Sequence, residues 1–337
     1  MKKLYITLSF VIASGILSAQ NKDTKTADKL FDRYEYTEAA NEYLKLVEKE
    51  KADNYVYKQL ADSYYNIFNT KEATKWFAKL VEEKQDAEVY FKYAQMLKAE
   101  GNYTEANNQM KTFSSMKPND SRAKAFTGNP NYVSDINAQF KLFGATKSDI
   151  SSDKADFGAF LTNDNTLYFA SARNTSRKEY GLNEEPYLDL YKATYNSNKT
   201  ISEATTVDNL NTKWHDGPAT ITSDGSTMYF ASESFNESKG FEKDKEKQLK
   251  FGKIYLYKAT KEGDTWSNKK ALPFNDKTYS VRNPSISKDG KTLYFSSNMP
   301  GGLGAEDIWK ATVNGDSYGT PENLGSRVNT EGNDSFP

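Results

Sequence analysis

The second half of the chain contains three copies of one sequence pattern, and each copy ends in a Tyr-Phe pair followed by small residues. The pairs begin at Tyr168, Tyr229 and Tyr294, so the copies lie 61 and then 65 residues apart. A period of this length, with hairpin-forming residues in each copy, predicts a β-propeller. Propellers present surfaces more often than single deep clefts, so the pattern indicates a scaffold or a binding protein first.

Each copy is typical of a four-stranded blade. Asp-Gly pairs at 224–225 and 289–290 supply the positive φ angles of a tight hairpin, and Asp164-Asn165 takes the same place one residue shorter. A further strand is expected at 188–194, 254–260 and 306–312. A last strand is expected near 206–210, 270–274 and 322–324.

The N-terminal third has helical spacing and no proline between residues 28 and 113. Alanines recur at Ala39, Ala73 and Ala106, and a bulky residue follows four positions after each: Tyr43, Phe77 and Met110. A small residue lets two helices approach closely, and the bulky one fills the adjacent groove. These copies of about 34 residues resemble tetratricopeptide (TPR) repeats, which are stacked helix pairs.

The first helix of each pair lines the concave face of such a stack. We therefore predict a partner-binding groove whose side chains come from two helices: Tyr55, Lys58, Asp62, Tyr65, Phe91, Gln95 and Lys98. Exposed aromatic side chains seldom lack a neighbour. The alternative is that these residues form a solvated helix face or pack on the protein's own next domain.

The N-terminus carries the pattern of a secretory signal peptide. Lys2-Lys3 precedes an apolar run over 4–17, and Ser18-Ala19-Gln20 offers a cleavage point, so residues 1–19 are the expected signal. No later stretch is apolar enough to cross a membrane. The chain has no cysteine, which excludes disulfides and thiol catalysis, and its net charge of −1 gives no reason to expect nucleic acid as a partner.

The sequence offers few groups for catalysis or metal binding. His215 is the only histidine, so a Ser-His-Asp triad would have one possible base, and we expect a loop role for it. Asp156, Asp216 and Asp334 recur at matching positions and are interpreted as caps of loop amides, with a calcium ion or a partner amine as the alternative. We predict no enzyme activity, no catalytic or metal-binding residues and no cofactor. Residues 239–250, absent from the other copies, are expected to form a mobile solvated loop, or a partner contact at the propeller rim.

The repeated units resemble the PD40 branch of WD40-like propeller repeats, also found in the TolB propeller. The resemblance is carried by Asn283-Pro284-Ser285-Ile286-Ser287, Asp289-Gly290, Tyr294-Phe295-Ser296-Ser297 and Gly301-Gly302, followed by Asp307-Ile308-Trp309. Together with the signal and the helical repeats, the whole chain resembles the N-terminal part of Bacteroidota OmpA-family periplasmic proteins. These include the PorE type, which is linked to type IX secretion and gliding.

That resemblance implies a periplasmic scaffold associated with the outer membrane. Its partners would be outer-membrane or secretion-system proteins, and a C-terminal OmpA-like domain outside this chain would bind peptidoglycan. Two other functions stay open: the propeller of a serine peptidase, and a glycan-binding envelope protein. A nucleophile-elbow motif beyond residue 337 would favour the first, and glycan binding by the blade loops the second.

The expected fold class is therefore α+β multidomain, with a TPR solenoid followed by an all-β propeller. The predicted divisions are a signal peptide at 1–19, helical repeats at 22–118, a linker at 119–139 and blades at 140–337. Residues 333–337 read like the opening of a fourth copy. Because three blades would leave open sheet edges, we expect these residues to belong to a longer protein with more blades.

Overall fold

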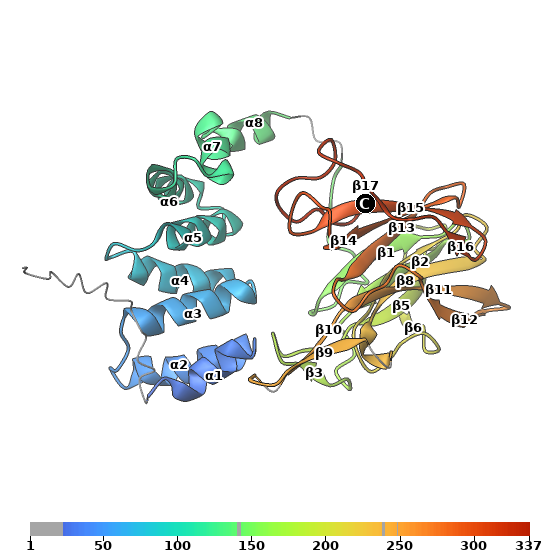
Figure 1. The fold of residues 1–337 in the computed structure, drawn as a ribbon, viewed down its shortest axis with the longest axis horizontal. Coiled ribbons are helices and arrows are strands. Elements are labelled where there is room, and N and C mark those ends of the chain that lie inside the picture. Colours follow the sequence, from blue (N-terminus) through green and yellow to red (C-terminus); the bar gives the residue numbers. More distant parts are fainter. Residues whose placement is uncertain (1–22, 140–142, 238–239, 248) are drawn as a thin grey trace, which may run out of the picture. The chain divides into compact units, whose positions relative to one another are not determined.

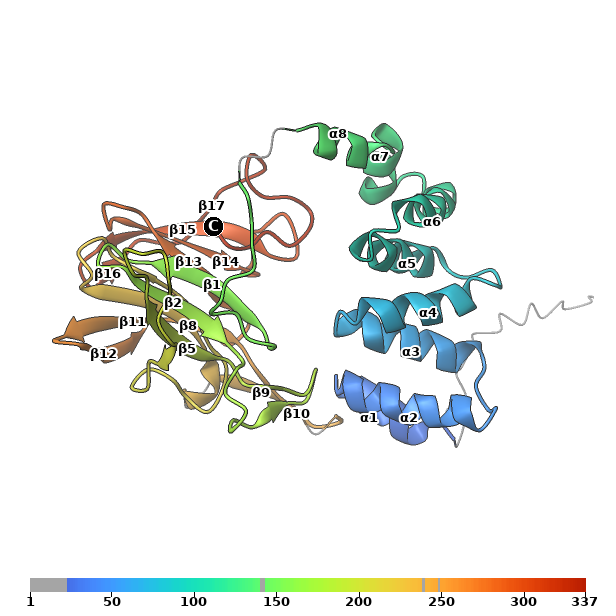
Figure 2. The ribbon, with the colours of Figure 1, turned by 180° about the vertical axis from the view of Figure 1, so that it is seen from behind.

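The computed structural model describes residues 23–139, 143–237, 240–247 and 249–337. The chain separates into a helical unit that ends near residue 140 and a strand-rich unit that follows it (Figures 1 and 2). This confirms the predicted fold class, a helical domain followed by a β domain. The predicted signal peptide, residues 1–19, lies outside the described residues. Within the described ranges, no helix combines the length and apolar character needed to cross a bilayer.

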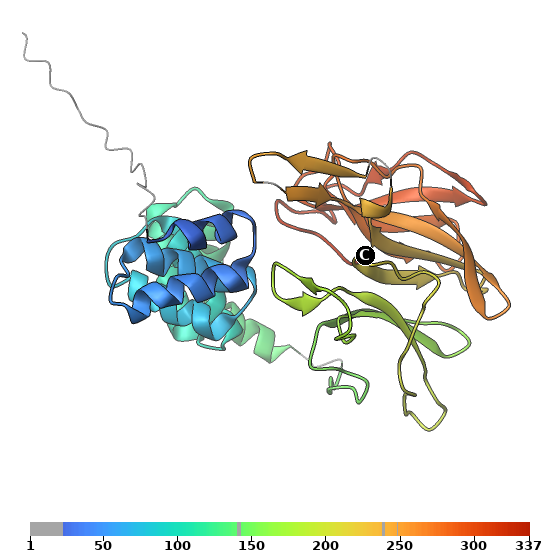
Figure 3. The same cartoon turned by 90° about the horizontal axis from the view of Figure 1, so that it is seen from below.

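The helical unit is a stack of antiparallel helices, seen along the stack in Figure 3. The helices in the described ranges are α1 (Lys25–Asp32), α2 (Tyr36–Glu48), α3 (Asn54–Asn66), α4 (Thr70–Leu80), α5 (Ala87–Ala99), α6 (Tyr103–Met116), α7 (Ser121–Gly128) and α8 (Tyr132–Ala138). Each helix from α1 to α6 contacts the next one along the chain. This is the arrangement that the repeat spacing predicts.

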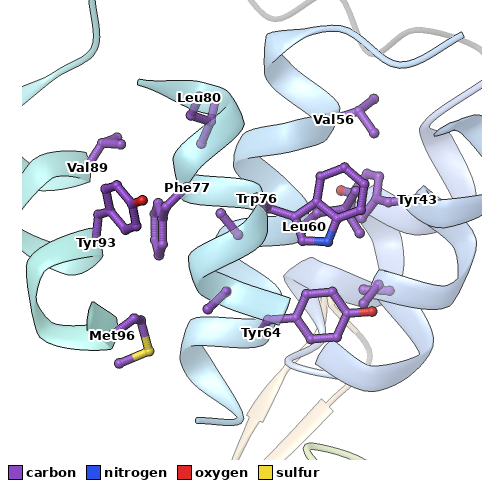
Figure 4. Close-up of a cluster of buried hydrophobic side chains, with 14 of the residues drawn as sticks. Tyr43, Val56, Leu60, Tyr64, Trp76, Phe77, Leu80, Val89, Tyr93 and Met96 are labelled. Atoms are coloured by element: carbon purple, nitrogen blue, oxygen red, sulfur yellow. The ribbon is translucent and has the colours of Figure 1, made fainter. Parts of the chain in front are cut away.

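The repeated alanines lie at the helix contacts, as predicted. Ala39, Ala73 and Ala106 are fully buried, and so is Phe77. In the close-up of this core, the rings of Phe77 and Tyr93 face each other across the α4–α5 contact, with their centres 6.0 Å apart (Figure 4). The close approach of the helices leaves room for a methyl group at these positions and for nothing larger.

Each of the first three helix pairs turns through a residue with positive φ. These residues are Tyr34 (φ 64°), Phe68 (φ 55°) and Gly101 (φ 76°), again 34 and 33 positions apart. The following amide donates back to a carbonyl five residues earlier, for example from Asn69 to Tyr64 at 2.9 Å. This is the Schellman ending of a helix, which glycine adopts most easily.

The segment expected to be a linker, residues 119–139, contains the helices α7 and α8. The Asp120 side chain caps α7 by accepting a hydrogen bond from the Arg122 amide at 2.9 Å. Ala123 and Phe126 are buried in one cluster with Phe113 of α6. The interpretation of residues 127–131 as a loop did not predict helix α7, which packs on α6 and continues the stack.

The strand-rich unit contains three antiparallel sheets, which we call blades 1, 2 and 3. Blade 1 contains β1 (Asp156–Leu161), β2 (Thr166–Ser171), β5 (Asp189–Thr194) and β6 (Thr205–Thr206). Blade 2 contains β7 (Asp216–Ile221), β8 (Thr227–Glu233), β11 (Ile254–Glu262) and β12 (Thr265–Ala271). Blade 3 contains β13 (Val281–Ile286), β14 (Thr292–Ser297) and β15 (Asp307–Asn314), with β16 (Ser317–Tyr318) and β17 (Glu322–Asn323) both paired to β15. The described residues form no closed barrel.

The first strands of the blades, β1, β7 and β13, contact one another in chain order. The hairpins after them turn as predicted, since Asn165, Gly225 and Gly290 all have positive φ. The apolar clusters span neighbouring blades: Leu190 of blade 1 shares one cluster with Phe230 of blade 2. The blades therefore pack face to face and share their cores.

Two short hairpins extend from the blades. One joins β2 to β5 and contains β3 (Glu179–Tyr180) and β4 (Glu185–Pro186). The other joins β8 to β11 and contains β9 (Phe241–Asp244) and β10 (Leu249–Gly252). The second hairpin lies in residues 239–250, which were expected to form a mobile solvated loop. The β pairing within this segment was not predicted. Lys239 and residue 248 lie outside the described residues.

Candidate partner-binding groove

Tyr55 on α3 is engaged with the protein's own core. Its hydroxyl donates to Asp28 Oδ1 at 2.8 Å, and the Tyr43 hydroxyl donates to the same oxygen at 2.6 Å. Thr24 donates to the other oxygen, Asp28 Oδ2, at 2.8 Å. Burial, together with the hydrogen bond to Asp28, raises the pKa of Tyr55 to about 12. Tyr55 therefore joins α1 to α3 within the helical unit, which neither the predicted groove nor the solvated face or next-domain contact had foreseen.

Lys58 and Asp62 form an ion-pair group that links α3 to α5. Asp62 is buried and accepts from Lys58 Nζ at 2.6 Å and from Lys92 Nζ of α5 at 2.7 Å. The Lys92 ammonium also lies 5.1 Å from the centre of the Tyr65 ring. Tyr65, expected to be exposed, is partly buried and lies edge-on to Phe77 at 6.3 Å. These four residues hold neighbouring repeats together.

The remaining three predicted residues, Phe91, Gln95 and Lys98, lie together in one pocket of about 320 Å³. They occupy successive turns of α5, as expected for one face of a helix. The opposite wall comes from α6, α7, α8 and the turn between the last two: Met110, Arg122, Ala125, Phe126, Asn129 and Tyr132. Within the described residues, the predicted face of α5 thus lines a pocket together with α6 and the segment expected to be a linker.

Arg122 fixes one side of this pocket. Its guanidinium makes a bidentate ion pair with Glu88, at 2.9 and 3.0 Å, and also bonds to Asp120. Its Cζ lies 4.2 Å from the centre of the Phe91 ring and 4.9 Å from that of Phe113. The charge of Arg122 is therefore already paired, and its planar face forms part of the apolar wall.

Lys98 is the cation that remains for a ligand. Its Nζ lies 5.3 Å from the centre of the Tyr132 ring, and among the described residues it forms no ion pair. Burial lowers the pKa of Lys98, which means that its charge is incompletely solvated. A half-buried ammonium beside an apolar wall suits an acidic group at the end of, or next to, an apolar peptide side chain.

The sequence analysis did not predict the opposite wall of this pocket. Its residues Arg122, Phe126 and Tyr132 lie in the segment interpreted as a linker. The sequence signal that could have found them is Asp120, a residue that commonly caps a helix, followed by the helix-forming run Ser121-Arg122-Ala123-Lys124-Ala125.

The recurring carboxylates of the blades cap loop amides, as interpreted from the sequence. Asp156 accepts from the Ser152 amide at 2.6 Å, and Asp334 accepts from the Thr330 amide at 2.6 Å. The Asp216 carboxylate accepts from the Thr212 amide in the same way. In each case the amide lies four residues earlier, so one carboxylate organises the turn before its strand.

No protein-family model and no curated protein matches the chain. Its structural neighbours include TPR repeat proteins. The C-terminal part of a TPR repeat-containing protein from Cytophaga hutchinsonii aligns with 21% identity and a TM-score of 0.29, covering 32% of this chain and 45% of that one. The first TPR of Spaghetti, bound to an HSP90 peptide, aligns with 18% identity and a TM-score of 0.29, covering 34% and 90% of the two chains.

A third neighbour aligns over half of the chain. It is a puromycin-hydrolyzing peptidase from Mycobacterium tuberculosis, with 10% identity and a TM-score of 0.32, covering 51% of this chain and 22% of the peptidase. The chain thus spans less than half of the Cytophaga protein and less than a quarter of the peptidase. None of these similarities assigns a partner or an activity to this chain.

Proposed function

We propose that this chain is a non-enzymatic scaffold whose helical unit binds a segment of a partner protein in the pocket formed by α5, α6, α7 and α8. The observation that carries the proposal is Lys98, a half-buried cation without an ion pair among the described residues, beside a wall of aromatic side chains. Phe91 and Gln95 lie beside it on the same face of α5. The partner segment would present an apolar side chain next to an acidic group.

We further propose that the scaffold acts in the periplasm, at the outer membrane, as part of a type IX secretion or gliding assembly. An OmpA-like domain outside this chain would hold it to peptidoglycan. Support for these finer statements comes from the sequence: the signal pattern of residues 1–19, the 34-residue helical repeats and the PD40-like motifs around Tyr294-Phe295. The blades would then serve as a second surface for envelope proteins.

Substitution of Lys98 tests the groove. In cross-linking and capture from outer-membrane extracts, Lys98→Met should reduce recovery of the partner by about tenfold or more, because a charge-assisted hydrogen bond contributes about 1.5–3 kcal/mol. Lys111→Met, which changes an exposed lysine on α6, is the matched control and should leave capture unchanged. Equal recovery with Lys98→Met and wild type would remove the groove from the proposal.

Localisation is tested separately. Expressed in a Bacteroidota host, the mature protein should be found in the periplasmic and outer-membrane fractions and should begin near residue 20. Recovery of the full chain from the cytoplasm, with Met1 retained, would contradict the envelope assignment. It would leave the proposal for the groove unaffected.

A further inference from the structure

The strand-rich unit contains a second pocket, of about 500 Å³, built by the two hairpins that blade 3 lacks. The β3–β4 hairpin of blade 1 contributes Tyr180, and the β9–β10 hairpin of blade 2 contributes Phe241. In blade 3, the corresponding connection between β14 and β15 spans only residues 298–306. The pocket is therefore specific to these two blades and is not a by-product of the repeat. Its volume is in the range of small-molecule sites.

Aromatic rings form a continuous wall of this pocket. Tyr187 lies 5.6 Å from Tyr180 and 5.6 Å from Trp214, and Trp214 lies 4.6 Å from Phe235, measured between ring centres. Phe235 in turn lies 6.1 Å from Phe241. The rings are tilted or edge-on to one another, and all five residues line the pocket. Such walls attract cations through the negative charge density of the ring face.

A buried carboxylate lies in the same lining. Glu233, the last residue of β8, is 8% exposed, and its Oε2 has no hydrogen-bond partner among the described residues. The nearest basic nitrogen, His215 Nε2, is 3.9 Å from Glu233 Oε1. His215 Nδ1 accepts a hydrogen bond from the Leu188 amide, and burial lowers the pKa of His215 to about 4, so this imidazole is neutral at pH 7. A buried carboxylate without a compensating charge is costly unless it is protonated or a ligand supplies a positive charge.

Two lysines complete the lining at its exposed side. Lys213 Nζ lies 5.2 Å from the centre of the Trp214 ring, and Lys250 Nζ lies 5.0 Å from that of Phe241. Among the described residues, neither forms an ion pair with Glu233. They would repel a bare cation that approached the aromatic wall. They would attract an anionic group carried next to that cation.

We propose that this pocket binds a small zwitterion, with its ammonium group between the aromatic rings and Glu233 and its anionic group beside Lys213 and Lys250. Quaternary ammonium compounds that carry a phosphate or a carboxylate have this chemistry, and they occur both as free molecules and as lipid headgroups. The ammonium group supplies the positive charge that would compensate the Glu233 carboxylate. The anionic group uses lysines that have no acidic partner in the pocket.

Calorimetric titration of the full chain tests the proposal with four probes: phosphocholine, glycine betaine, choline and inorganic phosphate. The two zwitterions should bind, choline should bind about fivefold or more weakly, and phosphate alone should not bind. Glu233→Gln, which keeps the shape of the side chain, should weaken phosphocholine binding by about tenfold or more. Glu242→Gln, an exposed carboxylate on β9, is the matched control and should have no effect.

The lysines are tested at the exposed end, where a substitution does not disturb the core. Lys213→Met with Lys250→Met should weaken phosphocholine binding and leave choline binding unchanged or stronger. Phosphatidylcholine vesicles separate the two sources: binding to vesicles identifies a headgroup, and binding only to free phosphocholine identifies a soluble molecule. Either result supports the zwitterion site.

Three results would overturn the proposal. The first is the absence of binding by both zwitterions at millimolar concentration. The second is equal binding to wild type and to a Glu233→Gln protein whose circular dichroism is unchanged. The third is binding of a neutral oligosaccharide that neither Glu233→Gln nor the lysine substitutions affect, which would assign the aromatic wall to sugars.

Discussion

At the scale of single residues, two positions carry side chains that lower the stability of the fold. Phe68 has a φ of 55°, a left-handed conformation that is strained for a residue with a side chain. Its ring is 66% exposed, so packing of the ring contributes little stability. Glu233 is buried without a compensating charge. Each case leads to a prediction with a definite sign.

Phe68→Gly should stabilise the helical unit by about 0.5–1 kcal/mol, because glycine adopts positive φ without steric cost and the exposed ring contributes little. The reciprocal substitution is Gly101→Ala, at the equivalent turn, which should cost about 1 kcal/mol since φ is 76° there. Urea unfolding followed by the helical signal at 222 nm measures both. If Phe68→Gly lowered and Gly101→Ala raised the free energy of unfolding, the conformation of these turns would not be what limits stability.

Stability should depend on pH through Glu233. Burial, with a smaller contribution from Asp216, raises the pKa of Glu233 from 4.5 to about 7. Between these values the folded state binds more protons than the unfolded state, so stability is greatest below pH 4.5 and falls as the pH rises through 7. The other charged or titratable groups around this carboxylate are His215, Tyr180, Tyr187, Lys213 and Lys250.

Comparison with Glu233→Gln isolates this contribution, since the remaining groups are common to both proteins. Wild type should lose about 2–3 kcal/mol relative to the variant between pH 4.5 and pH 7. Unfolding by urea at several pH values measures the difference. A difference that is constant over this range would mean that the carboxyl group of Glu233 titrates normally.

At the scale of elements, the spacing of small and large residues determines how the helices pack. Ala73 of α4 is fully buried where the adjacent helices contact it, and Ala99 at the end of α5 is exposed. The same residue type therefore has two roles. Its neighbours in space, which the repeat spacing predicts, decide which role it has.

Ala73→Leu should destabilise the helical unit by about 1–3 kcal/mol, because a larger side chain at the helix contact forces the helices apart. Ala99→Leu adds the same atoms at an exposed position and should change stability by less than about 0.5 kcal/mol. Thermal unfolding at 222 nm compares the two. Equal effects would argue against close helix contact as the function of the repeated alanines.

At the scale of the whole molecule, the blades are not independent units. Leu190 of blade 1 is fully buried in a cluster with Phe230 of blade 2, and Trp266 Nε1 of blade 2 donates to the Tyr168 hydroxyl of blade 1 at 3.3 Å. Removal of apolar volume from one blade should therefore destabilise its neighbour.

Leu190→Ala should cost about 2–5 kcal/mol, since it leaves a cavity in this shared cluster. Hydrogen exchange followed by mass spectrometry should show faster exchange in β8 and β11 of blade 2 as well as in β5 of blade 1. Ser197→Ala, at an exposed position of the loop after β5, serves as a control for general loosening. Faster exchange confined to blade 1 would mean that the blades open separately.

The helical and the β repeats could both be predicted from the amino-acid sequence, because their signals recur at a fixed spacing. The turns at 224–225 and 289–290 act within a few residues, and the alanines at 39, 73 and 106 pack against helices that are adjacent along the chain. The positions of the candidate sites could not be predicted from this spacing, because they follow from contacts between distant parts of the chain. Three of the seven predicted groove residues line a pocket, and three of the others, Tyr55, Lys58 and Asp62, are held in contacts between helices. Tyr180, Glu233 and Phe241 come together from connections of different length in two blades. Their proximity depends on how sheets stack and on where hairpins project, and these long-range contacts leave no period in the sequence.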